Sequence, residues 1–544
     1  MIPRTRSQNL SAKPPLLLAL IAGLGLALAL GLSSPDARAS CASSSNVEGG
    51  GTEAKSKANN ACPSAGPKGC LELALEAMGG SARLEGIKNM SFEAVGHTLL
   101  VEQSYRQDPF ITSYERMSAR VDFAGNRIRV ETHEIWPESD PGQAESDSTM
   151  VAGPEGCVRK ARDASGKPAS DSPCSLADID WERDALALGP LRLLRTALRA
   201  LDLHFSSDET VRATSHTVLA FSWQGMPVRI MLNPFNHLPD AVEKVAQFHD
   251  HWYQWGDVRQ RIYFDNWQTV RGIRYPTNQV EERNGVLWKS TQFLDLKFEV
   301  PRDAALFNMD AKTARLGAQS KGWERSFEAK TATRLAPGIT LFPGAWNATL
   351  VKQEDGIAVL EAPVSGTYVA GVMAEAKKQY PNLPLTAVMS TSDSWPHVGG
   401  VRQAVALNLP VYILDLNKPL LDRLIAAKHE LHPDLLAETP RAPVWRIVSQ
   451  KTSLGSGENR MELYPLRGAS TERQYLVYFP QHHLLYASDT LAINDDGTLY
   501  DPELMREVVE AVEREGLEVS TVFAMHHGPV AWTSVVALVK KALN

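Results

Sequence analysis

The sequence lacks the motifs of several large protein classes. Only five cysteines occur in 544 residues, and none has the Cys-x-x-Cys or Cys/His spacing of a structural zinc module. No glycine-rich phosphate loop, Gly-x-Ser-x-Gly elbow or Cys/His nucleophile pair is present, which argues against P-loop nucleotide binding and against serine or cysteine hydrolase chemistry. No internal repeat occurs, so the chain is not a solenoid or an array.

A net positive charge is also missing. The formal net charge is −7 at pH 7, and residues 1–39 carry four basic residues against one acidic residue, so the remainder carries −10. Because phosphate binding needs a basic face, we expect no nucleic-acid partner. The hydrophobic content of 43% and the charged content of 22% are typical of a soluble globular protein. The length predicts two domains with appendages.

The N-terminus has the layout of a secretory signal. Basic residues precede an apolar run over residues 16–32, and Ala37-Arg38-Ala39 offers small residues at positions −3 and −1. We expect residues 1–39 to be a signal peptide, and the protein to be exported to the periplasm or secreted. Two alternatives stay open. The segment could remain as a membrane anchor, the only membrane contact we expect, or a lipid could be attached at Cys41.

The cysteines fit an oxidising compartment. Cys157 and Cys174 flank a stretch rich in Gly, Ser, Asp and Pro, and Cys62 and Cys70 flank a short segment with two prolines. Each pair is suited to a disulfide bond, which leaves Cys41 as the odd cysteine.

After the leader, the chain divides into a short polar stretch and two patterned regions. Residues 40–69 hold almost no large apolar side chains and cannot bury enough surface to order themselves, so we predict a disordered linker. A short helix, Leu71–Gly80, is stopped by glycine, and segments of two-residue alternation follow as far as Phe298. The spacing of Trp181–Leu203 fits a helix laid over a sheet. These patterns predict an antiparallel curved sheet or half-barrel over residues 70–310.

The layout of this region resembles that of the bacterial lipoprotein carriers, whose curved sheet wraps around a helix. The likeness is carried by residues 262–286, with turns at Gly272 and at Asn284-Gly285. It implies a small-molecule or lipid-like ligand for this domain. The aromatic residues between His249 and Trp255 fit either a cavity lining or an ordinary core.

The last part of the chain alternates strand and helix patterns. A connector, residues 311–336, is rich in Lys, Ala and Arg and leads into it. Within residues 337–544 the expected helices include Val401–Ala406 and Pro502–Glu515, with strands between them. This order predicts an αββα sandwich, with sheets inside and helices outside. The expected fold class is therefore α+β: an antiparallel curved sheet with a helix, followed by a sandwich.

Four segments of this last part occur in the order that is typical of one hydrolase superfamily. They are Phe342–Asn347 with Asp355–Glu361, Thr391–Gly400, Leu476–Pro480 with Leu484–Asp489, and His527–Pro529. The second segment has the length, the preceding strand and the Gly-Gly end of a Thr-His-x-His-x-Asp-His-x-Gly-Gly loop. Residues 337–540 therefore resemble the metallo-β-lactamase superfamily. The resemblance implies an αββα fold that holds one or two metal ions between strand ends.

Most of the metal ligands of that superfamily are absent here. The resemblance places Ser392 and Ser394 at the first two histidines, Pro396 at the aspartate and Ser470 at the third histidine. A serine hydroxyl is a poor neutral ligand for zinc, and proline offers none. We therefore expect the first metal site to be lost.

Three positions keep a ligand residue: His397, Asp489 and His527. Three protein ligands with an open fourth position are enough for one catalytic zinc ion. His526 or Asp393 could substitute for a ligand, although neighbours in an extended chain point to opposite sides.

The same three residues also have ordinary structural interpretations. His397 could form hydrogen bonds in its loop, Asp489 could cap the turn at Thr490, and His527 could be a turn residue. We expect an exported protein whose sandwich is a catalytically degenerate scaffold or binding module, with one zinc ion or none as cofactor. The alternative is a single-metal hydrolase that cleaves an ester, amide or phosphoester bond with water held at the three ligands. The sequence leaves open whether the protein is an enzyme.

Overall fold

The computed structural model describes residues 62–101, 110–135, 145–160, 170–250, 252–329, 331–494 and 496–543. The expected signal peptide and most of the expected linker lie outside these ranges. All described residues belong to one compact unit. In the described part of the chain, no helix has both the length and the apolar character needed to cross a bilayer.

The first described element is helix α1, Cys62–Ala77, which begins before the predicted start at Leu71. It contains Pro67 and a non-helical Gly66, and the Cys62–Cys70 disulfide links its first residue to its third turn. The second predicted disulfide, Cys157–Cys174, is also present, so both pairings are confirmed.

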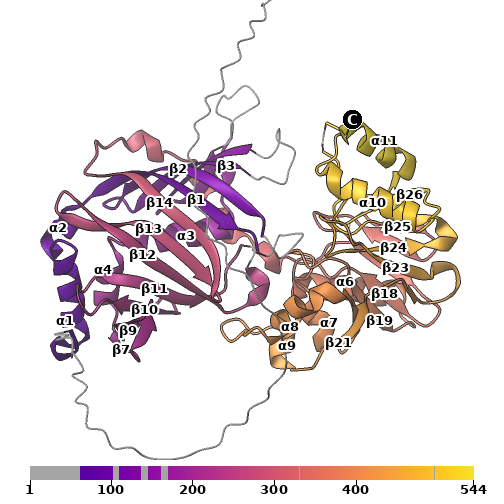
Figure 1. Cartoon of the computed structure of the whole chain (residues 1–544), viewed down its shortest axis with the longest axis horizontal. Coiled ribbons are helices and arrows are strands. Elements are labelled where there is room, and N and C mark those ends of the chain that lie inside the picture. The colour runs from indigo at the N-terminus through magenta and orange to yellow at the C-terminus, as the bar shows by residue number, and fades with distance from the viewer. Residues whose placement is uncertain are drawn as a thin grey trace, which may run out of the picture. The chain divides into compact units, whose positions relative to one another are not determined.

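One antiparallel sheet dominates the first half of the chain (Figure 1). Its strands are β1 Asn89–Leu99, β2 Thr112–Asp122, β3 Arg127–Ile135, β4 Glu145–Gly153, β5 Gly156–Lys160, β6 Ser172–Pro173, β7 His204–Phe205, β9 Thr214–Trp223, β10 Met226–Leu232, β11 Pro239–Ala246, β12 Val258–Val270, β13 Ile273–Arg283 and β14 Val286–Phe298. The order is β6-β5-β4-β3-β2-β1-β14-β13-β12-β11-β10-β9-β7, and β8 Glu209–Val211 pairs with β9. Asn284 and Gly285 both have positive φ, as a tight hairpin between β13 and β14 requires.

The predicted helical block in this half is two helices. They are α3 Leu176–Ala187 and α4 Leu193–Leu198, separated at Gly189-Pro190 because proline cannot continue a helix. Ser175 and Asp178 form a capping box at the start of α3. Helices α1 and α4 contribute Leu71, Leu75 and Leu194 to one core with the strands. Helix α2 is Ser81–Gly86.

Short helices connect the two halves of the chain. They are the 3₁₀ turns η2 Ala304–Phe307, η3 Gly317–Gln319 and η4 Gly322–Glu324, and helix α5 Ala311–Ala314. A further 3₁₀ turn, η1 Tyr253–Trp255, lies between β11 and β12. The first strand of the second half, β15 Thr333–Ala336, lies inside the predicted connector.

The second half contains two stacked sheets. The first is β15-β16-β17-β18-β19-β20-β21, with β16 Ile339–Phe342, β17 Ala348–Lys352, β18 Ile357–Leu360, β19 Leu385–Ser390, β20 Pro410–Leu414 and β21 Val444–Val448. The second is β22 Thr452–Leu454, β23 Met461–Pro465, β24 Tyr475–Phe479, β25 Leu484–Tyr486, β26 Thr521–Phe523 and β27 Val530–Ala531, in that order. Strands β18 to β21 are parallel to one another.

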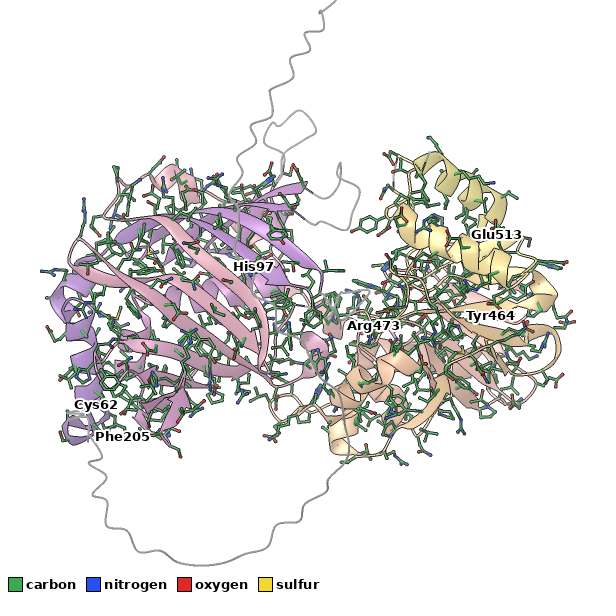
Figure 2. The ribbon with its side chains drawn as sticks, viewed as in Figure 1. Cys62, His97, Phe205, Tyr464, Arg473 and Glu513 are labelled. Carbon is green, nitrogen blue, oxygen red and sulfur yellow. A yellow bond between two sulfur atoms is a disulfide. The ribbon has the colours of Figure 1, made fainter. Side chains whose placement is uncertain are left out.

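Helices cover the outer face of each sheet. They are α6 Gly366–Gln379, α7 Val401–Ala406, α8 Lys418–Ala426 and α9 Leu435–Glu438, then α10 Pro502–Arg514 and α11 Trp532–Leu543. The remaining 3₁₀ turns are η5 Asp415–Asn417, η6 Gly457–Asn459 and η7 Pro480–His482. In Figure 1, α10 and α11 lie beside the second sheet, and α6 to α9 lie beside the first. Figure 2 labels Glu513, an exposed residue of α10.

The alternation along β24 shows why the layers form. Tyr475, Val477 and Phe479 pack between the two sheets, whereas Leu476 and Tyr478 pack against α10 and α11. Successive side chains of a strand point to opposite faces, so an apolar strand must be covered on both sides. The predicted αββα sandwich and the α+β class are confirmed by this arrangement.

Candidate metal centre

The loop Thr391–Gly400 follows the carboxyl end of β19 and leads into α7. Its Gly-Gly end is required by close packing. A Cβ on Gly399 would lie 2.4 Å from the carbonyl oxygen of Val364, and one on Gly400 would lie 2.3 Å from the side chain of Val369. No larger residue fits at either position, and the loop is therefore held against the segment that enters α6.

His397 of this loop is completely buried. Its Nε2 lies 3.2 Å from Oδ1 of Asp489, and its Nδ1 lies 3.9 Å from Oε2 of Glu361. Neither ring nitrogen makes a hydrogen bond of good geometry. A buried polar atom without a partner costs free energy, so this imidazole is a strong candidate for a ligand.

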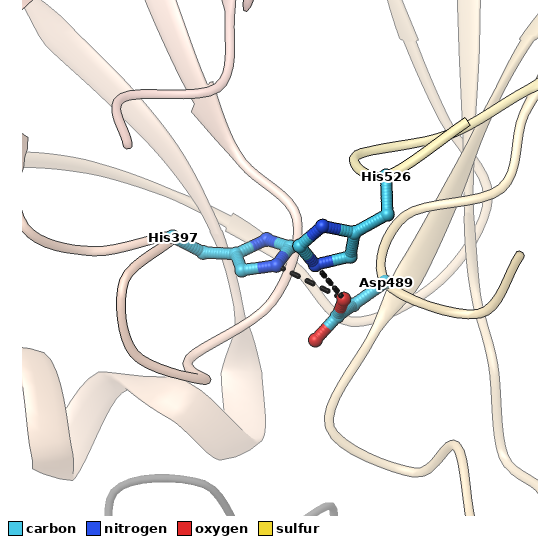
Figure 3. Close-up of side chains that lie close together, drawn as sticks. All are labelled: His397, Asp489 and His526. Atoms are coloured by element: carbon cyan, nitrogen blue, oxygen red, sulfur yellow. Dashed lines mark ion pairs between the residues drawn. The ribbon is translucent and has the colours of Figure 1, made fainter. Parts of the chain in front are cut away.

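Asp489 follows β25 and lies between two imidazoles (Figure 3). Its Oδ1 is 3.2 Å from His397 Nε2 and 3.0 Å from His526 Nε2. Burial raises the pKa of Asp489, but the charges of the two imidazoles and their close contacts with Oδ1 outweigh burial and hold the pKa well below its usual range. The backbone N–H of Asp489 donates to Gln474 Oε1 at 3.0 Å, which orients the turn.

His526 follows β26 and is the most accessible member of the cluster, with 34% of its side chain exposed. Its Nδ1 lies 2.8 Å from the carbonyl oxygen of Ala345. Burial lowers the pKa of His526, yet the hydrogen bond and the negative charge of Asp489 raise it more, so the net shift is upward. Because Nδ1 donates to a carbonyl, Nε2 is the nitrogen that can offer a lone pair.

The structure places His526, and not His527, beside the other two predicted ligands. The ring of His527 instead lies with Nδ1 2.8 Å from the carbonyl oxygen of Gly528. Strand β26 ends at Phe523, and Asn347 donates from its side-chain amide to the Ala524 carbonyl at 2.8 Å. The chain therefore turns before it reaches the histidines, and strand alternation no longer decides which of them faces the cluster.

The serines that the resemblance places at ligand positions make hydrogen bonds of their own. Ser392 Oγ accepts from the N–H of Ser394 at 3.1 Å, and Ser394 Oγ donates to the Trp395 carbonyl at 3.2 Å. The N–H of Ser470 donates to the carboxylate of Glu507 at 3.1 Å. The two contacts of Ser392 and Ser394 lie within the loop, that of Ser470 joins its segment to α10, and none of the three brings an imidazole or a carboxylate to the cluster.

Asp393 does not join the cluster either. It is 3% exposed and pairs with Arg473, whose Nε lies 2.7 Å from Oδ2. Burial raises the pKa of Asp393, and the guanidinium opposes that shift. The buried pair neutralises both charges beneath the loop.

Glu361 is a site residue that sequence reasoning missed. It is 1% exposed at the end of β18 and accepts hydrogen bonds from the hydroxyls of Thr391 and Tyr486. Burial raises its pKa, while His397 and these donors lower it. A glutamate directly after the wholly apolar strand Ile357–Leu360 is the signal that could have found it, because buried carboxylates need partners.

An aromatic group adjoins the accessible side of the cluster. The ring centre of Trp346 lies 6.2 Å from that of His526, and Trp395 lies 4.2 Å from Trp323. The guanidinium of Arg325 stands 5.1 Å from the centre of the Trp346 ring. The rim next to His526 is therefore apolar with one stacked cation.

The three residues fit a divalent metal ion. One ligand atom from each of His397, Asp489 and His526 can be chosen so that all three lie within 4.8 Å of one another. Two imidazoles and a carboxylate form a donor set that suits zinc, and the orphaned Nε2 of buried His397 is the atom that an ion would satisfy.

No family model matches the chain, and no curated protein matches it in sequence. Solved structures do match. They include the sec-alkylsulfatase Pisa1 from Pseudomonas sp. at 13% identity and a TM-score of 0.29, covering 39% of this chain and 42% of that chain. A metallo-β-lactamase from Pontibacter korlensis matches at 15% identity and a TM-score of 0.30, covering 39% and 98%. A metallo-β-lactamase from Erythrobacter litoralis matches at 17% identity and a TM-score of 0.29, covering 40% of this chain and 99% of that chain.

In fold, this chain is similar to metallo-β-lactamases. Metallo-β-lactamases, which the four sequence segments resemble, are among these matches. The match spans less than half of the alkylsulfatase chain.

Proposed function

We propose that the metallo-β-lactamase-like sandwich binds a single divalent cation, with His397, Asp489 and His526 as its ligands. The observation that carries this proposal is the buried ring of His397, whose nitrogens lack good hydrogen bonds although Asp489 and His526 converge on it. An unsatisfied buried polar group costs about 1–3 kcal/mol, and a bound cation would remove that cost. The structure favours His526 over the sequence-predicted His527 as the third ligand.

A second cation would find no imidazole or carboxylate at the remaining ligand positions, and the carboxylate of Asp393 in the loop is paired with Arg473. Ser392, Ser394 and Ser470 offer neutral hydroxyls that are poor zinc ligands, and Pro396 offers no side-chain donor. A two-metal mechanism needs both ions to stabilise the attacking and leaving oxygens. We therefore propose a metal-binding scaffold or binding module that has lost the two-metal chemistry.

Hydrolysis with one metal is the second candidate function, and the accessibility of His526 favours it. A cation held there would supply a Lewis acid that polarises the oxygen of an ester, amide or phosphoester. In this chain Ala345 orients His526, Gln474 orients Asp489, and Trp346 with Arg325 forms the rim where a substrate would lie.

We also propose that the protein is exported. Two disulfides, Cys62–Cys70 and Cys157–Cys174, support this proposal, because disulfides persist in oxidising compartments and are rare in the cytosol.

The test is zinc content by elemental analysis after exposure to excess zinc and buffer exchange. We expect about one zinc per chain in the wild type, a strong loss in His526→Ala and retention in His527→Ala. The two variants form a matched pair, because they remove neighbouring imidazoles from one turn. A screen of ester, amide and phosphoester substrates with the zinc-loaded protein then separates a hydrolase from a scaffold.

Two results would overturn the assignment. Zinc lost in His527→Ala but kept in His526→Ala would return the third ligand to His527. No retained zinc in the wild type would make the cluster a hydrogen-bonded group and end the hydrolase candidate.

A further inference from the structure

A cavity of about 250 Å³ lies between helix α3 and the curved sheet of the first half. The helix lines it with one face, because the residues involved recur at intervals of three and four. These residues are Ala177, Asp180, Trp181, Asp184, Ala185 and Leu188. The cavity is somewhat smaller than the ~300–1,000 Å³ of pockets for drug-sized ligands, which suits one narrow ligand.

The packing of α3 agrees with a space beneath it. Of its twelve residues only Leu186 is buried, and Trp181, which lines the cavity, is 41% exposed. A helix that covers a sheet normally buries an apolar stripe. Here the inner face borders the cavity, and ion pairs hold the helix in place instead.

Part of the wall opposite α3 is apolar. This part includes Phe92 from β1, Met117 from β2, Phe264 from β12 and Phe293 from β14, and strands β12 and β13 also place the polar side chains Gln260 and Gln279 in the lining. The rings of Phe92 and Phe293 meet edge to face with their centres 5.0 Å apart. An apolar wall of this kind makes no hydrogen bonds to water, so a hydrocarbon group binds there more favourably than water does.

The charged groups at the edge of the cavity are paired, with one exception. Asp180 lies 2.6 Å from His249, Lys244 pairs with Asp184, and Arg283 contacts Asp250.

Arg192 is the exception. Its guanidinium stacks on Phe123 at 4.4 Å from the ring centre, and within the described residues no carboxylate pairs with it. Burial and the nearby charge of Arg199 lower the pKa of Arg192, which indicates a site of positive potential. A half-buried guanidinium without a counter-ion is suited to bind an anionic group of a ligand.

We propose that this cavity binds a single-chain anionic amphiphile. The alkyl chain lies against the wall of Phe92, Phe264 and Phe293, and a carboxylate or phosphate head pairs with Arg192. The sequence led us to expect a small-molecule or lipid-like ligand, and this proposal specifies its chemical class. It is independent of the metal centre, so either proposal can fail alone.

The test is isothermal titration of the full chain with saturated fatty acids of six to sixteen carbons, each kept below its micelle concentration. Burial of a methylene is worth about 0.8 kcal/mol, so affinity should rise roughly fourfold per methylene until the cavity is full. Dodecanoate, dodecyl phosphate and dodecanol compare the head groups. We expect both anions to bind at least about tenfold more tightly than the alcohol.

Two substitutions test where the head group and the alkyl chain of the ligand bind. Arg192→Gln should abolish the preference for the anions, whereas Arg302→Gln, which removes an exposed guanidinium elsewhere, should keep it. Ala185→Phe fills the cavity and should shorten the chain length at which affinity stops rising. Thermal unfolding of each variant verifies that it is folded.

Three results would overturn the proposal. No binding by any member of the series would exclude the amphiphile. Equal affinity for acid and alcohol would exclude the anionic head group. Binding that is unchanged in both Arg192→Gln and Ala185→Phe would place the ligand elsewhere.

Discussion

Two histidines in different halves of this chain have nearly the same local partners. His216 in the curved sheet has Nδ1 2.9 Å from the Thr214 carbonyl and Nε2 2.9 Å from Asp240. His526 in the sandwich has Nδ1 2.8 Å from the Ala345 carbonyl and Nε2 3.0 Å from Asp489.

The second partner of each carboxylate separates the two sites. Asp240 also accepts from the side-chain amide of Asn233 at 2.7 Å, and an amide N–H can only donate. Asp489 has the imidazole of His397 instead, and an imidazole can either donate or offer a lone pair. The first set is therefore a closed hydrogen-bonded group, and the second can rearrange around a cation. The pattern around one histidine does not define a metal site; the second imidazole does.

The two halves also differ in packing, and core truncation should show the largest effect. Phe479 lies between the two sheets with no exposed surface, whereas Phe92 borders the cavity. We expect Phe479→Ala to cost about 3–5 kcal/mol of unfolding free energy. Phe92→Ala should cost clearly less, because one side of its ring already lacks packing partners. Denaturant unfolding measures both, and equal losses would mean that the cavity wall is as tightly packed as the sandwich.

Removing the carboxylate tests the comparison of the two histidine sites directly. Asp489→Asn should weaken zinc binding by about a hundredfold or more, because an amide replaces an anionic ligand. Asp240→Asn should leave zinc binding unchanged and affect only stability. Zinc titration of the two variants measures this contrast. A similar loss in both would contradict the distinction drawn between the sites.

The smallest expected effect is a pH dependence at the closed site. Burial lowers the pKa of His216, but Asp240 and the Thr214 carbonyl raise it more, so its folded value lies above the unfolded value of about 6.5. Its contribution to stability is fully present below about pH 6.5 and is lost as pH rises through the folded pKa. Each unit of upward shift is worth about 1.4 kcal/mol.

His216→Asn should therefore flatten the fall in unfolding free energy between neutral and alkaline pH. His237→Asn is the control, since it removes a neighbouring histidine at a positive φ that asparagine tolerates. A profile that keeps its slope in His216→Asn would assign the titration to another group.

Local patterns predicted much of this structure. The antiparallel sheet of the first half, the helix at Val401–Ala406 and the helix that starts at Pro502 were all expected from periodicity and turn residues. Helix α1 was predicted to start too late, because one helical turn precedes the non-helical Gly66 and Pro67 opens the longer part of the helix. The Cys62–Cys70 disulfide joins that first turn to the rest of the helix.

The candidate site was predicted in part. His397 and Asp489 do lie together, and the loop keeps the shape that Gly399 and Gly400 impose. Glu361 was missed because its partners Thr391 and Tyr486 come from other strands. Asp393 was considered as a possible ligand, but it forms an ion pair with Arg473, which is eighty residues away in the sequence.

The sequence by itself indicated the layers of the sandwich and the antiparallel curved sheet, and it suggested two cysteine pairs without fixing their pairing. These features depend on periodicity and on residue types that can be recognised within short stretches of sequence. Only the tertiary structure decided that His526 faces Asp489, because Asn347 from a distant strand end holds the turn after β26. It alone also placed a cavity beneath α3, since burial depends on what packs against a helix and not on the helix itself.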